Sequence, residues 1–134
     1  MMFLKKKYFD FEQVEDRLNI VWNKNALKIT EKIILSEIQK ISKLVLELKP
    51  KVMYVDICSL QAILVDETKK LFLEKMIPAY QNADIKLLAV CTGEDLFKQL
   101  FVSHILEEEM KQVNFQAKYF KTKNEAEDWL MSNK

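Results

Sequence analysis

The side chains in this sequence that could do chemistry are two cysteines, one histidine and one aspartate: Cys58, Cys91, His104 and Asp56. Thiols and imidazoles bind zinc, but zinc sites usually include a close-spaced pair of cysteines, and here the cysteines lie far apart in the chain. A histidine that acts as a general base needs a nucleophile or substrate group beside it, and the sequence around His104 supplies none. We therefore expect the cysteines to be small core residues, with no metal and no cofactor.

The chain is poor in the residues from which most recognisable active sites are built. Gly93 is its only glycine and His104 its only histidine. A phosphate-binding loop needs several glycines, and a nucleophilic triad needs histidine close to other polar partners. An enzyme would have to rest on Asp56 or Cys58, so we expect no enzymatic activity.

Asp56 lies where α/β sheets usually place their ligand crevice. It ends the apolar segment 52–57, and ligands of open α/β sheets bind beyond the carboxyl ends of the strands. Cys58, Thr92 and Thr122 are expected along the same rim. The alternative is a structural role, in which Asp56 caps a neighbouring amide or a helix.

Acidic residues begin the three helices that are expected at this rim. Such residues complement the helix dipole and occupy the place where a phosphate would bind. The sequence therefore argues against nucleotides and other phosphorylated ligands. The residues concerned are Asp66, Glu67, Glu94, Asp95 and Glu125.

Strand and helix patterns alternate along the chain and supply the frame that must hold these side chains. Alternating apolar and polar residues predict strands at 8–14 and 18–23, joined by a polar hairpin link. Apolar runs predict buried strands at 52–57 and 85–90, and alternation at 115–119 predicts a strand nearer the sheet edge. We expect a first helix from Thr30 to just before Pro50, and a second from Asp66 to a kink or end near Ile77 that is caused by Pro78. A third helix is expected over 94–110, and a fourth begins at a capping box formed by Thr122 and Glu125.

The order of these elements, ββαβαβαβα, predicts one α/β domain over residues 1–134. Strands separated by helices pair in parallel through right-handed crossovers, which gives a mixed, mostly parallel sheet of five strands with about four helices. In the first helix, Ile34, Ile38, Ile41, Val45 and Leu48 form one inward stripe. In the third, His104 follows Leu100 by four residues, which places it on or beside the apolar stripe, at the core boundary.

Composition narrows the classes of partner. The formal net charge is +1, so the basic surface expected of a nucleic-acid-binding protein is missing, and the run 5–7 of lysines is expected to be a solvated N-terminal segment. No segment matches a signal peptide or is long and apolar enough to span a bilayer. We therefore expect a cytoplasmic protein.

The chain resembles the small bacterial STAS/Sec14-like (SpoIIAA-like) proteins, which are related to the anti-sigma-factor antagonists. The residues that carry the resemblance are Trp22 at the end of a strand, the segment 49–56 (KPKVMYVD), Pro78 within a helix and the segment 119–130. In the antagonists, a strand ending in aspartate leads to a serine at a helix start, and phosphorylation of that serine breaks the contact with an anti-sigma factor. Here Asp56 matches, but 66–68 reads Asp-Glu-Thr in place of Ser-Ser-Gly, so the resemblance implies the fold and a binding face without the phosphorylation switch.

Two functions follow as hypotheses. The first is a non-enzymatic regulatory or scaffold domain that binds a protein partner at the rim, through Asp56, Cys58, Glu67, Thr68 and Lys69. The second, which the Sec14 side of the resemblance implies, is a carrier or sensor of a lipid-like apolar ligand, since the six methionines and eight phenylalanines suit an adaptable pocket. Edge strands with apolar residues also make a homodimer plausible.

Overall fold

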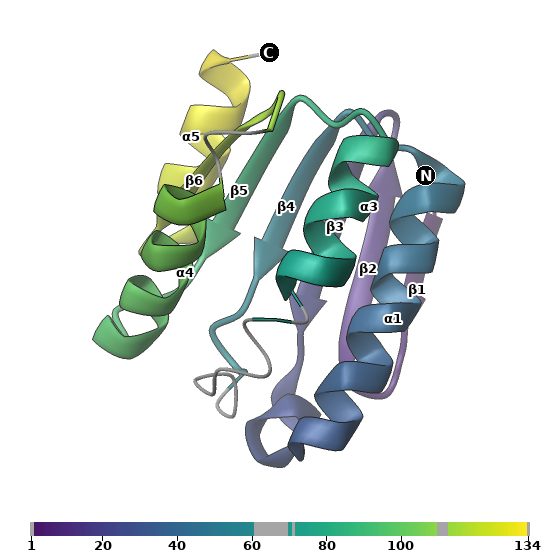
Figure 1. The fold of residues 1–134 in the computed structure, drawn as a ribbon, viewed down its shortest axis with the longest axis vertical. Coiled ribbons are helices and arrows are strands. Elements are labelled where there is room, and N and C mark those ends of the chain that lie inside the picture. The colour runs from purple at the N-terminus through teal and green to yellow at the C-terminus, as the bar shows by residue number, and fades with distance from the viewer. Residues whose placement is uncertain (1, 61–69, 71, 110–112, 134) are drawn as a thin grey trace.

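The computed structural model describes residues 2–60, 70, 72–109 and 113–133 of the chain. Within them, one mostly parallel sheet is covered by helices on both faces (Figure 1). Its six strands lie side by side in chain order: β1 (Met2–Lys5), β2 (Phe9–Val14), β3 (Arg17–Trp22), β4 (Val52–Asp56), β5 (Leu87–Cys91) and β6 (Gln116–Phe120). The α-helices are α1 (Glu31–Leu48), α3 (Ile77–Asn82), α4 (Leu96–Glu109) and α5 (Lys123–Ser132), and there are also a 3-10 helix η1 (Lys24–Lys28) and a π-helix η2 (Phe72–Met76). The expected single-domain α/β fold is confirmed.

The sheet has one strand more than the sequence patterns predict. β1 pairs antiparallel with β2, outside the hairpin of β2 and β3, while β3, β4, β5 and β6 pair in parallel. All four side chains of β1 are exposed, so the strand has no buried face and shows no apolar alternation. Backbone pairing to a neighbour is what makes it a strand, and the expected count of five was therefore wrong. The lysine run 5–7 is exposed, as expected.

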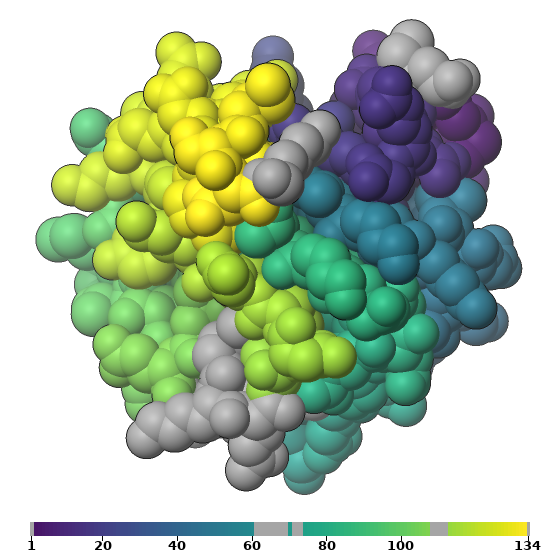
Figure 2. All heavy atoms as spheres, turned by 90° about the horizontal axis from the view of Figure 1, so that it is seen from above, coloured from purple at the N-terminus to yellow at the C-terminus, as the bar shows by residue number. Residues whose placement is uncertain are grey.

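Two apolar layers sandwich the sheet. The larger one packs α1, α3 and α4 against one face, and α5 covers the opposite face over β4, β5 and β6. Figure 2 shows α5 (yellow) on the side of the molecule away from the teal segment around residue 80. β4 is buried on both faces, as its apolar run predicts, with Met53 in the larger layer and Val52 and Tyr54 in the smaller one.

Local sequence signals set the limits of α1. The Thr30 hydroxyl accepts a hydrogen bond from the amide of Ile33, and the helix ends where Lys49 adopts a left-handed conformation before Pro50. Four members of the predicted stripe are buried and Leu48 is half-buried. The pattern at i, i+4 and i+7 therefore predicted the inward face of this helix.

The helix before Pro78 is irregular, as expected. Residues 72–76 form a π-helical turn, and α3 starts at Ile77 with the proline in its first turn. Proline is tolerated in a first turn because its missing amide hydrogen would have no partner there. Met76 and Ala79, on either side of this proline, are both buried.

The capping box at the start of α5 supports the first of our predictions. The Thr122 hydroxyl accepts from the amide of Glu125 at 3.2 Å and donates to its carboxylate at 3.1 Å. Thr122→Ala removes both interactions and should lower the free energy of unfolding by about 1 kcal/mol, measured by urea denaturation. Thr122→Ser keeps the hydroxyl and should recover most of that loss. An equal loss in both variants would contradict the capping role.

In the described part of the chain, no helix has the length and apolar character needed to cross a membrane.

Candidate functional site

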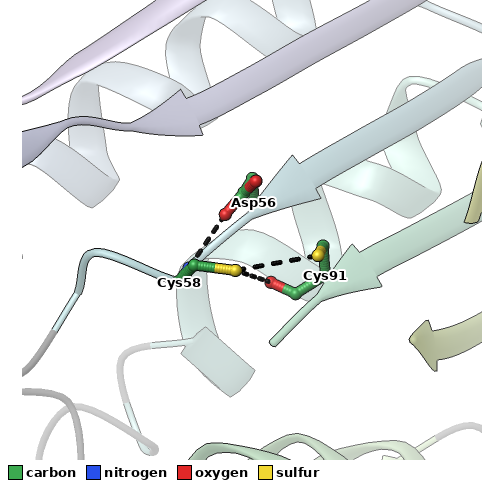
Figure 3. A group of neighbouring side chains, drawn as sticks. All are labelled: Asp56, Cys58 and Cys91. Carbon is green, nitrogen blue, oxygen red and sulfur yellow. Dashed lines mark hydrogen bonds between the residues drawn. The ribbon is translucent and has the colours of Figure 1, made fainter. Parts of the chain in front are cut away.

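Asp56, Cys58 and Cys91 meet at the carboxyl ends of β4 and β5 (Figure 3). The two Sγ atoms are 3.7 Å apart, and one oxygen of Asp56 and both sulfurs all lie within 4.8 Å of one another. Cys91 is buried, as expected of a core thiol, whereas Cys58 is exposed, so the expectation of a core position was wrong for Cys58. The structure thus brings together two of the sequence-predicted site residues and adds Cys91 as the third.

Strand register explains the meeting. Asp56 and Cys91 are direct neighbours in the parallel pairing of β4 with β5, so their side chains lie on the same face of the sheet. Tyr54, two residues before Asp56, lies on that face too and is buried under α5. Past the strand end, the amide of Cys58 donates to Asp56 Oδ1 at 2.9 Å, and this Asx-type bond turns the chain so that the thiol comes back over β5.

The surroundings of Asp56 favour the protonated forms of the Tyr54 phenol and the Cys58 thiol. The Tyr54 hydroxyl donates to Asp56 Oδ2 at 3.2 Å. Burial, together with the nearby Asp56 carboxylate, raises the pKa of the Tyr54 phenol above its ordinary value. Burial and then the hydrogen bond and charge of Asp56 likewise raise the pKa of the Cys58 thiol. Without a cation, Cys58 is therefore a thiol at neutral pH and a weak nucleophile.

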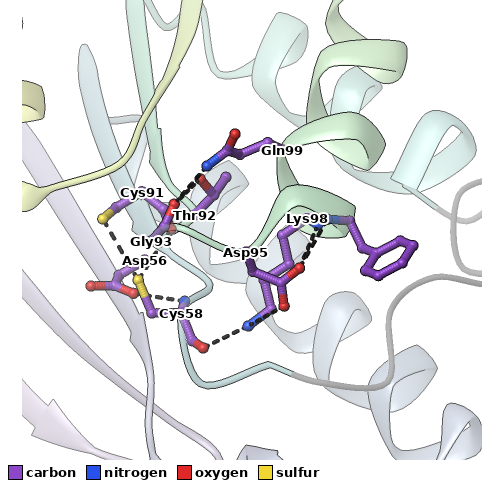
Figure 4. A network of polar contacts seen from close by, with 9 residues as sticks. Asp56, Cys58, Cys91, Thr92, Gly93, Asp95, Lys98 and Gln99 are labelled. Carbon is purple, nitrogen blue, oxygen red and sulfur yellow. Dashed lines mark hydrogen bonds and ion pairs between the residues drawn. The ribbon is translucent and has the colours of Figure 1, made fainter.

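A second polar network ties α4 to this rim (Figure 4). Lys98 is only 2% exposed, and its ammonium donates to the carbonyl oxygen of Cys58 at 2.6 Å and lies 4.0 Å from Asp95. Gln99, also buried, donates to the carbonyl of Gly93 at 3.0 Å. These bonds supply donors to two backbone carbonyls in the connections that follow β4 and β5.

The first turns of α4 have the reverse of normal helix polarity. Lys98 and Gln99 point inward to the rim, while Leu96, Phe97 and Leu100 point outward with exposed fractions of 69%, 69% and 67%. Surface helices normally bury their large apolar residues and expose their charged ones. The apolar cluster of Leu96, Phe97 and Leu100, here called the α4 patch, is the largest such group of exposed side chains on any described helix.

The outward orientation of this helix face also changes the expected place of His104. It lies four residues after Leu100, on the stripe that also contains Leu96, but that stripe faces outward and His104 is exposed. The expected place at the core boundary was therefore wrong, because the inward face of α4 is formed by other residues, Val102 and Ile105 among them. His104 is also not part of the thiol cluster; among the described residues the third member is Asp56.

The other rim predictions resolve into structural roles. Thr92 is buried and its hydroxyl donates to the carbonyls of Gly93 and Phe120. Thr122 caps α5, and Asp95 accepts from the first amides of α4, which therefore begins two residues later than expected. Asp56 does cap a neighbouring amide, as its structural alternative required. Three expected contact residues lie outside the described part of the chain: Glu67, Thr68 and Lys69.

An apolar cavity of about 60 Å³ lies between the sheet and the pair α3 and α4. Its wall is almost entirely hydrocarbon. It is lined in part by Val55, Val90, Ile77, Tyr80, Val102 and Ile105. An engineered cavity of about 150 Å³ binds benzene, and this space is less than half that size, so as it stands it accommodates only a small apolar group.

Sequence reasoning missed two of the residues that build this region, Tyr54 and Lys98, and expected Cys91 only as a small core thiol. Tyr54 stands out in the sequence only as part of the predicted strand 52–57. A usable signal existed for Tyr54, because a residue two before Asp56 in a strand must share its face. Nothing local to Lys98 indicates that it faces inward.

Comparison of the chain with protein-family models, with curated proteins and with solved structures gave no match. The likeness to the STAS/Sec14-like group stays a prediction from the sequence. The structure supports the coarser statement of a mixed, mostly parallel α/β sheet with helices on both faces.

Proposed function

We propose that this protein is a regulatory or scaffold domain that binds a partner protein through the α4 patch and the adjoining start of the loop at Cys58. The observation that carries the proposal is the reversed polarity of α4. Contiguous large apolar side chains on a surface mark interaction sites, because leaving them in water forgoes the free energy of burying them. The sequence-based hypothesis placed the contact on the loop after β4, and Lys98 joins that loop to the α4 patch through the carbonyl of Cys58.

The inward polar residues fix the patch in place. Lys98 and Gln99 each bind a carbonyl of the rim, so the first turns of α4 cannot rotate to bury Leu96 and Phe97 without leaving buried polar groups unpaired. A preformed apolar surface loses less conformational entropy on binding than one that must first rearrange. The patch therefore has the properties of a rigid docking surface.

Charge defines the complementary chemistry of the partner. Exposed acidic residues stand at both ends of the stripe, Glu94 before it and Glu107 seven residues after Leu100. We expect the partner to present an apolar surface with basic groups at its rim. Rim charges of this kind mainly speed association and choose between partners, and the buried apolar centre supplies affinity.

The experiment begins with a photo-crosslinking phenylalanine analogue at position 97, which keeps an aromatic side chain at a position that is already exposed. Crosslinking in extracts of the source cells identifies the partner, and titration calorimetry then measures its affinity. Phe97→Ser with Leu100→Ser should weaken binding at least about tenfold, with thermal stability almost unchanged because both side chains are exposed.

Met131→Ser is the matched control, because Met131 is 67% exposed but lies on α5. It should leave the affinity unchanged. Unchanged affinity in the Phe97 and Leu100 variant would contradict the proposal. Crosslinks only to a second copy of the chain would also contradict it, and would assign the patch to a homodimer.

The alternative function, a carrier of an apolar ligand, is favoured by one observation, the hydrocarbon-lined cavity beneath α4. A lipid-like chain needs more space than the cavity offers, so α4 would have to move away from the sheet. Native mass spectrometry of gently isolated protein tests this directly. A lipid-sized adduct that is lost on denaturation would support the carrier function over the partner-binding one.

A further inference from the structure

We propose that Cys58, Cys91 and Asp56 form a zinc-binding site, with two thiolates and one carboxylate oxygen as three of the four ligands. The site contains no side chain of the α4 patch, although it shares Cys58 with the adjoining loop, and it does not rest on the proposed partner binding. Asp56 and Cys91 are paired residues at the ends of β4 and β5, and Cys58 lies two residues past the end of β4.

The separation of the sulfurs fits tetrahedral coordination. With zinc–sulfur bonds of about 2.3 Å and tetrahedral angles, two thiolates on one zinc ion lie about 3.8 Å apart. Cys58 and Cys91 already have their Sγ atoms 3.7 Å apart. A linear two-coordinate ion would hold its sulfurs twice a bond length apart, well beyond this separation, and a disulfide needs them at about 2.05 Å. Tetrahedral zinc is therefore the arrangement that requires the least movement of the sulfurs.

The carboxylate reaches the same point after a small adjustment. In a tetrahedral site a sulfur and a carboxylate oxygen lie about 3.6 Å apart. The Asp56 oxygen now lies within 4.8 Å of both sulfurs, so it has to move toward them by roughly 1 Å. Rotation of the Asp56 side chain can supply that movement. The Tyr54 hydroxyl already donates to Asp56 Oδ2, the kind of supporting hydrogen bond that orients carboxylate ligands in metal sites.

The charges around the cluster suit a divalent cation. Two thiolates and one carboxylate bring three negative charges to a partly buried place, and binding releases the two thiol protons to solvent. The nearby ammonium of Lys98 is directed at the carbonyl of Cys58 and at Asp95, on the α4 side of the loop. Since Cys58 is exposed, an ion can enter from solvent, and a fourth position stays open for water or a further ligand.

The test is a titration of the whole reduced, chelator-treated protein with cobalt(II), the spectroscopic substitute for zinc, under anaerobic conditions. We expect one ion per chain, thiolate charge-transfer bands in the near ultraviolet, the strong visible bands of tetrahedral cobalt, and their loss when zinc is added. Cys58→Ser and Cys91→Ser should each weaken binding and reduce the charge-transfer intensity. Asp56→Asn and Tyr54→Phe should lower the affinity by about tenfold or more.

Glu94→Gln is the matched control, because it removes an exposed carboxylate of the same rim that is outside the cluster, and it should bind cobalt like the unaltered protein. Cys58→Ser alters an exposed position, so this variant keeps the test valid if Cys91→Ser fails to fold. No cobalt bands, binding that survives both cysteine changes, or one ion per two chains would overturn the proposal. Joint loss of both thiols to a low-molecular-weight disulfide, without metal binding, would overturn it in favour of a redox pair.

Discussion

Leu130→Ala will lower the free energy of unfolding by about 3 kcal/mol and the melting temperature by roughly 10 °C. Leu130 is fully buried on α5, which is the only helix that the described residues place on its face of the sheet. The apolar layer there is small, and Phe120, Ala126 and Leu130 cover the side chains of β4 and β5. Few neighbours are available to move into the space, so most of the cavity should persist.

The adjacent residue on the same helix provides the control for this prediction. Met131 is 67% exposed, so Met131→Ala should change stability by no more than about 0.5 kcal/mol. Urea denaturation of the two variants measures the difference. A similar loss of unfolding free energy in both variants, or a loss below about 1 kcal/mol for Leu130→Ala, would show that packing of α5 does not stabilise this face of the sheet. Leu130 packs in the same apolar layer as Tyr54 and Cys91, so the result also measures how firmly these two rim residues are held.

Gly93→Ala will cost about 2 kcal/mol of stability, from two separate causes. Gly93 has φ of +69°, in the left-handed region, where a side chain on the α-carbon costs about 1–2 kcal/mol. In addition, a Cβ at this position would lie 3.3 Å from Cys58 Sγ, closer than ordinary van der Waals contact. The only glycine of the chain therefore stands where the rim needs both a positive φ and a thiol close to the backbone.

A double-mutant cycle separates the two causes. Gly93→Ala combined with Cys58→Ala removes the sulfur that the new methyl group would meet, so only the backbone cost should remain. We therefore expect the glycine substitution to be less destabilising in the Cys58→Ala background than in the unaltered protein. Additive effects would contradict the close contact between this turn and the thiol.

Local patterns were enough to predict most of the secondary structure. Thr30 and the Thr122–Glu125 pair cap the helices that they were expected to cap, because capping depends on residues three positions apart. Apolar runs predict the buried strands β4 and β5, since a strand covered on both faces has no polar side. By contrast, β1 depends on pairing with β2 and has no buried face, so it leaves no pattern to detect.

The orientation of α4 could not be predicted in the same way. The spacing of Leu100 and His104 correctly places them on one stripe, but periodicity does not say which side of a helix meets the core. That choice depends on Lys98, whose ammonium donates a hydrogen bond to the carbonyl of Cys58, 40 residues earlier in the chain. A contact between such distant residues exists only once the sheet has formed.

The sequence by itself determined the class of the fold, the order of the strands from β2 onward, the caps of α1 and α5, and the arrival of Asp56 at the end of a buried strand. These follow from backbone preferences and from spacings of two, three and four residues, which act within one element. Only the tertiary structure decided that Cys58 and Cys91 lie side by side, that Tyr54 supports Asp56, and that the α4 patch faces outward. Those arrangements depend on the register between parallel strands and on polar groups finding partners across the sheet rim, and neither leaves a periodic trace along the chain.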